Sequence, residues 1–239
     1  MRTIIVPDYE TMSGVAANEV AIQMLKKNNL CLGLATGSTP VGMYQVLVQF
    51  FKDRFIDFSK IKTVNLDEYI GLEPDHEQSY ALFMKEHLFS HVNCTNYNLP
   101  NGKAENLEEE CSRYDSVASN IDLQILGIGA NGHIGFNEPS DTWTEGTCVA
   151  DLTTQTISDN ARKYFDGDME LVPKTAISMG IKQIMESKQI ILIANGKEKA
   201  QAIFNMINGP VTPQCPASIL QQHPNVTVII DKEAAQKLH

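Results

Sequence analysis

Short apolar runs alternate along the chain with longer stretches that mix apolar and polar residues. The runs that fit strands are residues 3–6, 31–35, 61–66, 123–126, 189–194 and 226–230. Several of them are nearly continuous in Val, Ile and Leu, which is typical of strands that are buried on both faces. The pattern therefore predicts a sheet at the centre of the molecule.

The stretches between these runs have the spacing of amphipathic helices. Ala17, Ala21 and Leu25 recur every four residues, so they share one face of a helix. The other apolar stripes are Tyr44, Leu47, Val48 and Phe51, then Tyr80, Phe83, Met84 and Leu88, and later Ala202, Ile203, Met206 and Ile207. Strand–helix–strand alternation implies parallel strands joined by right-handed crossovers. We therefore expect the α/β class, as a three-layer α/β/α sandwich with a mostly parallel, Rossmann-like sheet.

Domain organisation follows from what the chain lacks. No linker, internal repeat or low-complexity tract divides it, so we expect residues 1–239 to form a single domain. The segment 208–216 is rich in Pro and Gly and predicts a long loop. The least regular segment is 136–173, which is polar, contains the sole tryptophan, Trp143, and is a candidate lid.

Ligands of open parallel sheets bind outside the carboxyl ends of the strands, so the residues after each apolar run are the first to consider. After the second run come Gly37, Ser38, Thr39 and Pro40, and then a helical pattern. Gly37 permits a tight turn, and the helix would direct free N–H groups and its positive end at an anion. A plain helix N-cap made by Ser38 or Thr39 explains the same residues equally well. The loop is not a Walker A motif, because no Gly-Lys-Ser/Thr follows at the required spacing.

Two adjacent carboxylates, Asp67 and Glu68, follow the third run. A carboxylate in a partly dry cleft can act as a general base. Neighbours on an extended segment point in opposite directions, so only one of the pair is expected to face a site. A surface turn, which Asp and Glu favour in any case, is the simpler interpretation of these two residues alone.

The most distinctive segment, residues 127–139, follows the fourth run. Glycines at positions 127, 129, 132 and 135 surround His133, and Glu138 follows it. Histidine can move protons near neutral pH, and a carboxylate can orient it. The same glycines form a weak dinucleotide-binding pattern, but the matching acidic residue, Asp151, lies outside any predicted strand end. Glycines, His133 and Glu138 together favour a catalytic loop.

Two cations, Arg162 and Lys199, are candidates for clamping a phosphate near the strand ends. Such residues more often lie on exposed helix faces. Physical reasoning alone does not separate them from their neighbours Lys163 and Lys197.

Composition and charge restrict the function classes. With 19 Lys and Arg against 29 Asp and Glu, the formal charge is -10, which argues against sequence-independent binding to nucleic acid or to an anionic membrane. No run approaches the ~18 apolar residues of a membrane span, and the N-terminal apolar run is too short for a signal peptide. The 5 cysteines show no CxxC spacing, so we expect free thiols and a cytoplasmic protein.

The segments named above, taken together, resemble the glucosamine-6-phosphate deaminase (isomerising) family. The matching pieces are residues 35–40, 65–69, 132–139, the segment around Arg162, 172–174 and 196–200, in the order that the family shows. Gly-His-Ile-Gly-Phe-Asn-Glu-Pro at 132–139 is the most specific of them. The resemblance covers most of the chain from Cys31 to Lys199. It implies a catalytic domain of amino-sugar catabolism that converts glucosamine 6-phosphate and water to fructose 6-phosphate and ammonia.

The resemblance also implies roles for individual residues. Asp67 corresponds to the base that moves a proton between C2 and C1 of the sugar, and His133 to the proton carrier that opens the ring. Glu138 belongs to the group that supports His133. Gly37, Ser38, Thr39, Arg162 and Lys199 correspond to the phosphate site. No metal or organic cofactor is implied, because the substrate's own amine forms the electron sink through an imine.

The sequence departs from the family pattern in two respects. Asn131 stands where many members have Asp, so it cannot supply a charge to His133, although its carbonyl oxygen can still hold a ring N–H. We therefore expect ring opening to depend more on Glu138. The chain also continues for only nine residues after Ile230, whereas hexameric members regulated by N-acetylglucosamine 6-phosphate are longer. We expect a monomer or small homo-oligomer with weak or absent allosteric control.

Two alternative functions remain open on the sequence. A 6-phosphogluconolactonase of the same superfamily would use His133 to activate water and would have no use for Asp67 as a carbon base. A non-catalytic sugar-phosphate sensor domain of a transcription regulator would keep the phosphate site. The sensor is disfavoured because no basic helix-turn-helix precedes Thr3 and because Asp67, His133 and Glu138 are all present.

Overall fold

The computed structural model describes residues 1–238 and is built around one parallel sheet. Its strands are β1 (Arg2–Val6), β2 (Cys31–Leu34), β3 (Lys62–Asn65), β5 (Asn96–Asn98), β6 (Leu123–Leu126), β9 (Ile190–Ala194) and β10 (Val226–Asp231). The seven strands are ordered β1-β10-β9-β6-β2-β3-β5, and every neighbouring pair is parallel. All the strands expected from the sequence are present. The additional edge strand β5 is short and polar, so it has no apolar run that could reveal it.

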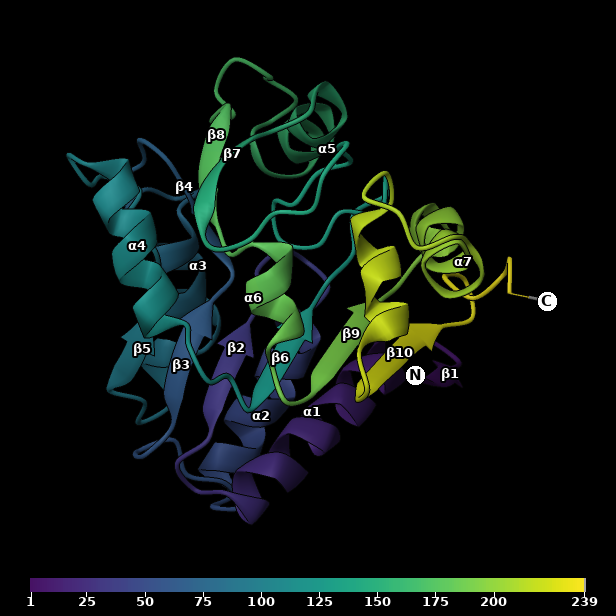
Figure 1. Cartoon of the computed structure of the whole chain (residues 1–239). Coiled ribbons are helices and arrows are strands. Elements are labelled where there is room, and N and C mark those ends of the chain that lie inside the picture. Colours follow the sequence, from purple (N-terminus) through teal and green to yellow (C-terminus); the bar gives the residue numbers. More distant parts are fainter. Residues whose placement is uncertain (239) are drawn as a thin grey trace.

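Helices cover both faces of this sheet (Figure 1). The helices are α1 (Tyr9–Lys26), α2 (Val41–Lys52), α3 (Tyr80–His87), α4 (Leu107–Val117), α5 (Thr154–Tyr164), α6 (Ile181–Met185) and α7 (Ala200–Asn208), with short 3-10 helices η1 (Phe89–His91), η2 (Lys197–Lys199) and η3 (Pro216–Gln222). Buried residues of α1 and α2 form one apolar cluster with one face of the sheet, and those of α4, α6 and α7 form a second cluster with the other face. The predicted three-layer α/β/α fold is confirmed.

A second, antiparallel sheet lies beyond the carboxyl ends of the main strands and was not predicted from the sequence. It consists of β4 (Asp67–Tyr69), β8 (Thr175–Ser178) and β7 (Cys148–Asp151), in the order β4-β8-β7. Together with α5 it encloses a third apolar cluster that includes Tyr69, Phe136 and Phe165. Figure 1 shows this small sheet and α5 above the arrowheads of the main sheet.

The segment 136–173, which is the least regular by composition, includes two regular elements that the sequence did not indicate. It contains all of β7 and α5. The polar positions that concealed α5 lie on its exposed face, while Ile157 and Ala161 are buried in the third cluster. The apolar face of α5 consists of few residues, so its apolar stripe was hard to recognise in the sequence.

The strand order explains where a site forms. Strands β9, β6, β2 and β3 are consecutive neighbours in the parallel sheet, so their carboxyl ends lie along one edge. The segments that follow these strands are residues 35–40, 66–67, 127–139 and 195–199. The fold therefore brings together the candidate segments that follow these four strands. No helix within residues 1–238 is both long enough and apolar enough to cross a membrane.

Candidate active site

A cavity lies at this edge, bounded by the loops after the central strands and by α5. Of the residues expected from the sequence, the cavity is lined by Gly37, Ser38, Thr39, Asp67, His133 and Lys199. Asn131 and Glu138 lie behind His133, and Arg162 does not line the cavity. Helix α5 contributes four polar lining residues that the sequence did not single out as candidates: Thr156, Asp159, Asn160 and Tyr164. They were missed because α5 itself was not recognised.

The loop before α2 has the geometry of an anion site. Gly37 turns the backbone at φ +88°, a conformation that glycine adopts readily. The N-cap alternative for Ser38 and Thr39 is wrong, because Pro40 occupies the N-cap position of α2 and neither of their side chains accepts an N–H group of the helix. Thr39 Oγ1 instead donates to Asn195 Oδ1 at 3.0 Å, and the Ser38 N–H donates to Tyr164 Oη at 3.1 Å. Among the first N–H groups of α2, that of Gly42 donates to Tyr9 Oη at 2.8 Å, and the positive end of the helix lies behind the Gly37–Thr39 loop.

Asp67 and Glu68 point to different surroundings, as the alternation of an extended segment predicts. Glu68 accepts hydrogen bonds from the backbone N–H groups of Tyr80 (2.9 Å) and Ala81 (2.8 Å), and so stabilises the beginning of α3. Asp67 opens β4 opposite Ser178, is only 6% exposed and lines the cavity. Glu68 therefore has a structural role, and Asp67 is the carboxylate that reaches the cavity.

Burial changes the chemistry of Asp67. Loss of water around the carboxyl group, with the nearby charge of Glu68 as a second cause, raises the pKa of Asp67 to about 8. A buried carboxyl group of this kind is protonated at neutral pH in the free protein. When ionised in these dry surroundings, it is a stronger base than an exposed carboxylate. This property suits removal of a proton from carbon.

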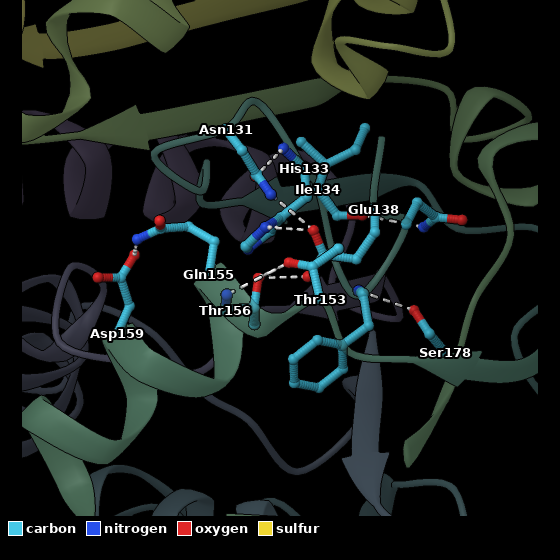
Figure 2. A network of polar contacts seen from close by, with 11 residues as sticks. Asn131, His133, Ile134, Glu138, Thr153, Gln155, Thr156, Asp159 and Ser178 are labelled. Atoms are coloured by element: carbon cyan, nitrogen blue, oxygen red, sulfur yellow. Dashed lines mark hydrogen bonds and ion pairs between the residues drawn. The ribbon is translucent and has the colours of Figure 1, made fainter. Parts of the chain in front are cut away.

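His133 is held from behind by Glu138 (Figure 2). His133 Nδ1 lies 3.4 Å from Glu138 Oε2, close enough for an ion pair when the ring is protonated. Glu138 also accepts hydrogen bonds from Asn131 Nδ2 at 2.7 Å and from the hydroxyl of Thr156. Burial tends to raise the pKa of Glu138, but His133, Thr156 and Asn131 outweigh it and lower the pKa to about 2. Glu138 is thus a permanent anion behind the histidine.

Asn131 contacts this pair differently from the expectation. Its Oδ1 accepts a hydrogen bond from the backbone N–H of His133 at 3.1 Å, and its amide group donates to Glu138. The prediction that Asn131 holds a ring N–H of His133 was therefore wrong. The physical reason is the tight turn at Gly132 (φ +89°), where an Asn side chain bonds the backbone two residues ahead. Asn131 positions Glu138 and the turn, and Glu138 alone faces the ring nitrogen.

Gly129 leaves room for the imidazole ring. A Cβ atom at this position would lie 2.2 Å from His133 Cε1, far inside van der Waals contact. Gly129→Ala is therefore expected to displace the ring and lower kcat by about 100-fold or more, since a shift of about 1 Å in a catalytic group has effects of this size. Steady-state kinetics with circular dichroism of the folded variant measures this effect.

The control for this substitution is Gly14→Ala, in α1. A Cβ atom at Gly14 has no neighbour within 4 Å, and Gly14 does not line the cavity. It is expected to keep full activity. Equal activity of the two variants would show that the His133 ring does not need its present position.

Of the two cations predicted to bind phosphate, the structure places Lys199 at the cavity but not Arg162. Lys199 lines the cavity, and burial together with the charge of Lys163 lowers its pKa. Lys163 lines the cavity as well. The side chain of Arg162 is 68% exposed and pairs with Asp159 at 3.2 Å, so the structure does not bring it to the cavity and its role stays a prediction. Within the described residues, no three His, Cys, Asp or Glu side chains are grouped to hold a metal ion.

Comparison with known proteins shows the family of the chain. Residues 10–229 match the family model described as glucosamine-6-phosphate isomerases/6-phosphogluconolactonase. The chain belongs to this family. The resemblance seen in the sequence motifs is confirmed by proteins named glucosamine-6-phosphate deaminase. One from Clostridium novyi is 53% identical over 100% of both chains, and one from Thermoanaerobacter pseudethanolicus is 53% identical over 98% of this chain and 94% of its own.

A solved structure agrees with the family assignment. It is described as a monomeric glucosamine-6-phosphate deaminase and superposes with a TM-score of 0.95 at 41% identity, covering 99% of each chain. The family includes two activities, so the assignment of one of them rests on the cavity and on these relatives together.

Proposed function

We propose that the protein is an enzyme that converts glucosamine 6-phosphate and water to fructose 6-phosphate and ammonia. The observation that carries the proposal is Asp67, a buried carboxyl group that lines the same cavity as His133 and the Gly37–Thr39 loop before α2. A lactonase needs His133 but no carbon base. The relatives with 53% identity are named deaminases, which supports the same choice.

His133 serves the opening of the sugar ring. The ring nitrogen that faces away from Glu138 accepts the proton of the C1 hydroxyl group and delivers it to the ring oxygen as the C1–O5 bond breaks. The positive charge that develops on the imidazole is stabilised by the Glu138 anion behind it. The substrate is then an open-chain aldehyde with its amine at C2.

Asp67 then carries out the isomerisation. Its carboxylate removes the proton from C2 and returns it to C1, while the nitrogen loses one proton and O1 gains one, so that the C1 carbonyl becomes a hydroxyl group and C2 becomes an imine. Water adds to C2 of the imine, the C–N bond breaks, and ammonia leaves to give the ketone. The ammonium form of the substrate favours the ionised carboxylate on binding, which offsets the pKa of about 8 in the free protein.

A coupled assay separates the two family activities. The purified protein is expected to release ammonia and fructose 6-phosphate in equal amounts from glucosamine 6-phosphate, and to leave 6-phosphogluconolactone at its uncatalysed rate of hydrolysis. Lactone hydrolysis without ammonia release would show that the lactonase is correct. Tight binding of the sugar phosphate with neither reaction would indicate the sensor.

We further propose that the protein is cytoplasmic and is a monomer or small homo-oligomer. We also propose that the chain forms one catalytic domain in which residues 136–173 act as a lid. The cysteines of the described chain are all free thiols, which supports a reducing compartment. A structural relative is described as monomeric. Helix α5 lies within the segment and supplies cavity residues, so movement of the segment would open the site. Light scattering of the purified protein tests the assembly.

A further inference from the structure

A second groove lies at the opposite end of the main sheet from the catalytic cavity. Helices α1 and α2 precede β2 and β3 in the chain, so the groove between their last turns lies at the amino ends of these strands (Figure 1). It has a volume of about 600 Å³, and its walls include Leu25 of α1 and Phe51 of α2. None of its lining residues lines the catalytic cavity, so the proposed function makes no use of this groove.

The groove presents apolar side chains to solvent. Phe55 is 65% exposed and Leu25 is 69% exposed. Ile22, about one turn before Leu25 on α1, is 45% exposed, so the apolar surface continues along α1 beyond the groove. Small ligands bind in concave pockets that bury most of their surface, whereas side chains as exposed as these line a shallow groove. The shape therefore favours a polypeptide segment as the occupant.

The charge of the groove is opposite to that of the whole protein. Lys52, Arg54 and Lys60 line it with a single carboxylate, Asp57, which accepts a hydrogen bond from Asn93 Nδ2 at 2.7 Å. None of the three cations forms an ion pair with a carboxylate of the described chain. Acidic side chains complement this charge. An anionic membrane would also face the rest of a protein with a formal charge of -10, so an acidic segment fits better.

Arg54 has a backbone conformation in which glycine is usual. It follows the C-cap of α2 in the left-handed region, at φ 61°. The N–H groups of Arg54 and Phe55 donate to the carbonyl groups of Phe51 (3.0 Å) and Phe50 (2.9 Å). The ring of Phe55 also packs edge-on against that of Phe50, with 6.2 Å between centroids. A glycine would make the same turn with less strain, so the fold gains nothing from the arginine side chain.

We propose that this groove binds an acidic, amphipathic segment of a partner protein. The apolar side chains of the segment pack on Leu25 and Phe55, and its carboxylates pair with Lys52, Arg54 and Lys60. The turn after α2 already holds Arg54 and Phe55 in place, so binding does not have to order their backbone. Aromatic and arginine side chains are the residues that most often dominate binding energy at interfaces. Binding here does not depend on the reaction in the catalytic cavity.

Binding of fluorescent peptides to the full chain tests the proposal. The first peptide has about 11 residues, or three helical turns, with Leu and Phe on one face and Glu or Asp elsewhere. A second carries Lys in place of the acidic residues, and a third carries Ser in place of the apolar ones. Fluorescence anisotropy is expected to show at least about tenfold tighter binding of the first peptide than of either control. Added salt is expected to weaken it, because exposed charges are screened. Equal binding of the three peptides, or no binding of the first, would overturn the proposal.

Arg54→Gly separates a role in binding from a role in the fold. It removes a cation and relieves the left-handed strain, so we expect about three- to tenfold weaker peptide binding and a Tm higher by about 2 °C. Asn120→Gly is the matched control, because Asn120 is exposed, left-handed (φ 59°) and outside the groove. It is expected to leave peptide binding unchanged. Unchanged binding by Arg54→Gly would overturn the proposal, and so would weaker binding with a lower Tm, which would show a damaged fold.

Phe55→Ala removes the exposed aromatic ring and is expected to weaken binding of the first peptide by about tenfold or more. Lys232→Gln removes an exposed lysine outside the groove and is expected to bind the peptide as the wild type does. Equal binding by these two variants would exclude the groove as the peptide site. Any ammonia release is expected to stay at the wild-type rate in both, because neither residue lines the catalytic cavity.

Sedimentation of the protein alone and flotation with vesicles of phosphatidylcholine and phosphatidylglycerol test the other occupants. The wild type is expected neither to self-associate through this groove nor to float with the vesicles. Self-association that Arg54→Gly abolishes would identify a second copy of the chain as the occupant. Flotation that the same variant abolishes would identify a membrane. Either result would overturn the assignment to a partner protein.

Discussion

Asp67→Asn is expected to lower the rate of ammonia release by about 1,000-fold or more while the protein stays folded. The amide has the shape of the protonated carboxyl group but cannot accept a proton from carbon, and general acid–base catalysis contributes about 10²–10⁴-fold. KM is expected to change little, because the residues expected to bind the phosphate, Gly37 to Thr39 and Lys199, line the cavity apart from Asp67 in the sequence and keep their side chains. Wild-type turnover by this variant would exclude Asp67 as the base.

The same substitution is expected to change the dependence of stability on pH. The folded pKa of about 8 lies above the ordinary value of 3.8, so folding takes up a proton between these limits. The free energy of unfolding of the wild type therefore falls as the pH rises from about 4 to about 8, with a slope of about 1.4 kcal/mol per pH unit from this group. Asp67→Asn lacks this slope and becomes the more stable protein towards pH 8.

Urea unfolding at several pH values, with kinetics on the same preparations, measures both effects. Asp75→Asn makes the same change at an exposed position and is expected to alter neither. A stability difference between Asp67→Asn and the wild type that stays constant from pH 5 to pH 8 would show that the carboxyl group titrates normally.

The main sheet and its active edge could be predicted because they depend on local patterns. Runs such as Ile190–Ala194 are apolar throughout, and the strand order then brings their ends together. The small sheet could not be predicted, since β4 is Asp-Glu-Tyr and β7 has exposed positions. Their pairing depends on contacts between distant segments, for which a single sequence gives no local signal.

The candidate site, too, could be predicted from the sequence only in part. Glycines around His133 and the carboxylate at Asp67 follow apolar strands, so their place was predictable. Thr156 is 18 residues from Glu138 in the sequence, and only the packing of α5 brings its hydroxyl group to that carboxylate. The choice between Arg162 and Lys163 depends on how α5 is rotated about its axis. That rotation is set by buried Ile157 and Ala161, which lie in an otherwise polar segment.

Glu138→Gln is expected to lower kcat on the cyclic substrate by about 100-fold. With Asn131 engaged by the backbone of His133, Glu138 is the carboxylate that compensates the imidazolium charge during ring opening. Without that charge, the imidazolium that forms during ring opening is no longer stabilised by an anion. The glutamine also meets donors from both Asn131 and Thr156, but it has one carbonyl oxygen to accept them.

The pH dependence of stability gives a second readout for Glu138. Its folded pKa of about 2 lies below the ordinary 4.5, so its contribution to stability is present above about pH 4.5 and is lost as the pH falls towards 2. The loss is on the order of 3 kcal/mol in the wild type, and the variant is expected to lack it. Unfolding free energies measured between pH 5 and pH 3 will show a flatter curve for the variant.

Two further variants separate the charge of Glu138 from its hydrogen bonds. Thr156→Val keeps the carboxylate and removes one donor, so its kcat is expected to fall by less than that of Glu138→Gln. Glu233→Gln makes the same chemical change at an exposed site and is expected to behave as the wild type. Near-full activity of Glu138→Gln on the cyclic sugar would mean that ring opening does not depend on the Glu138 charge. His133 would then act without an anionic partner, which the burial of its Nδ1 beside Glu138 makes physically costly.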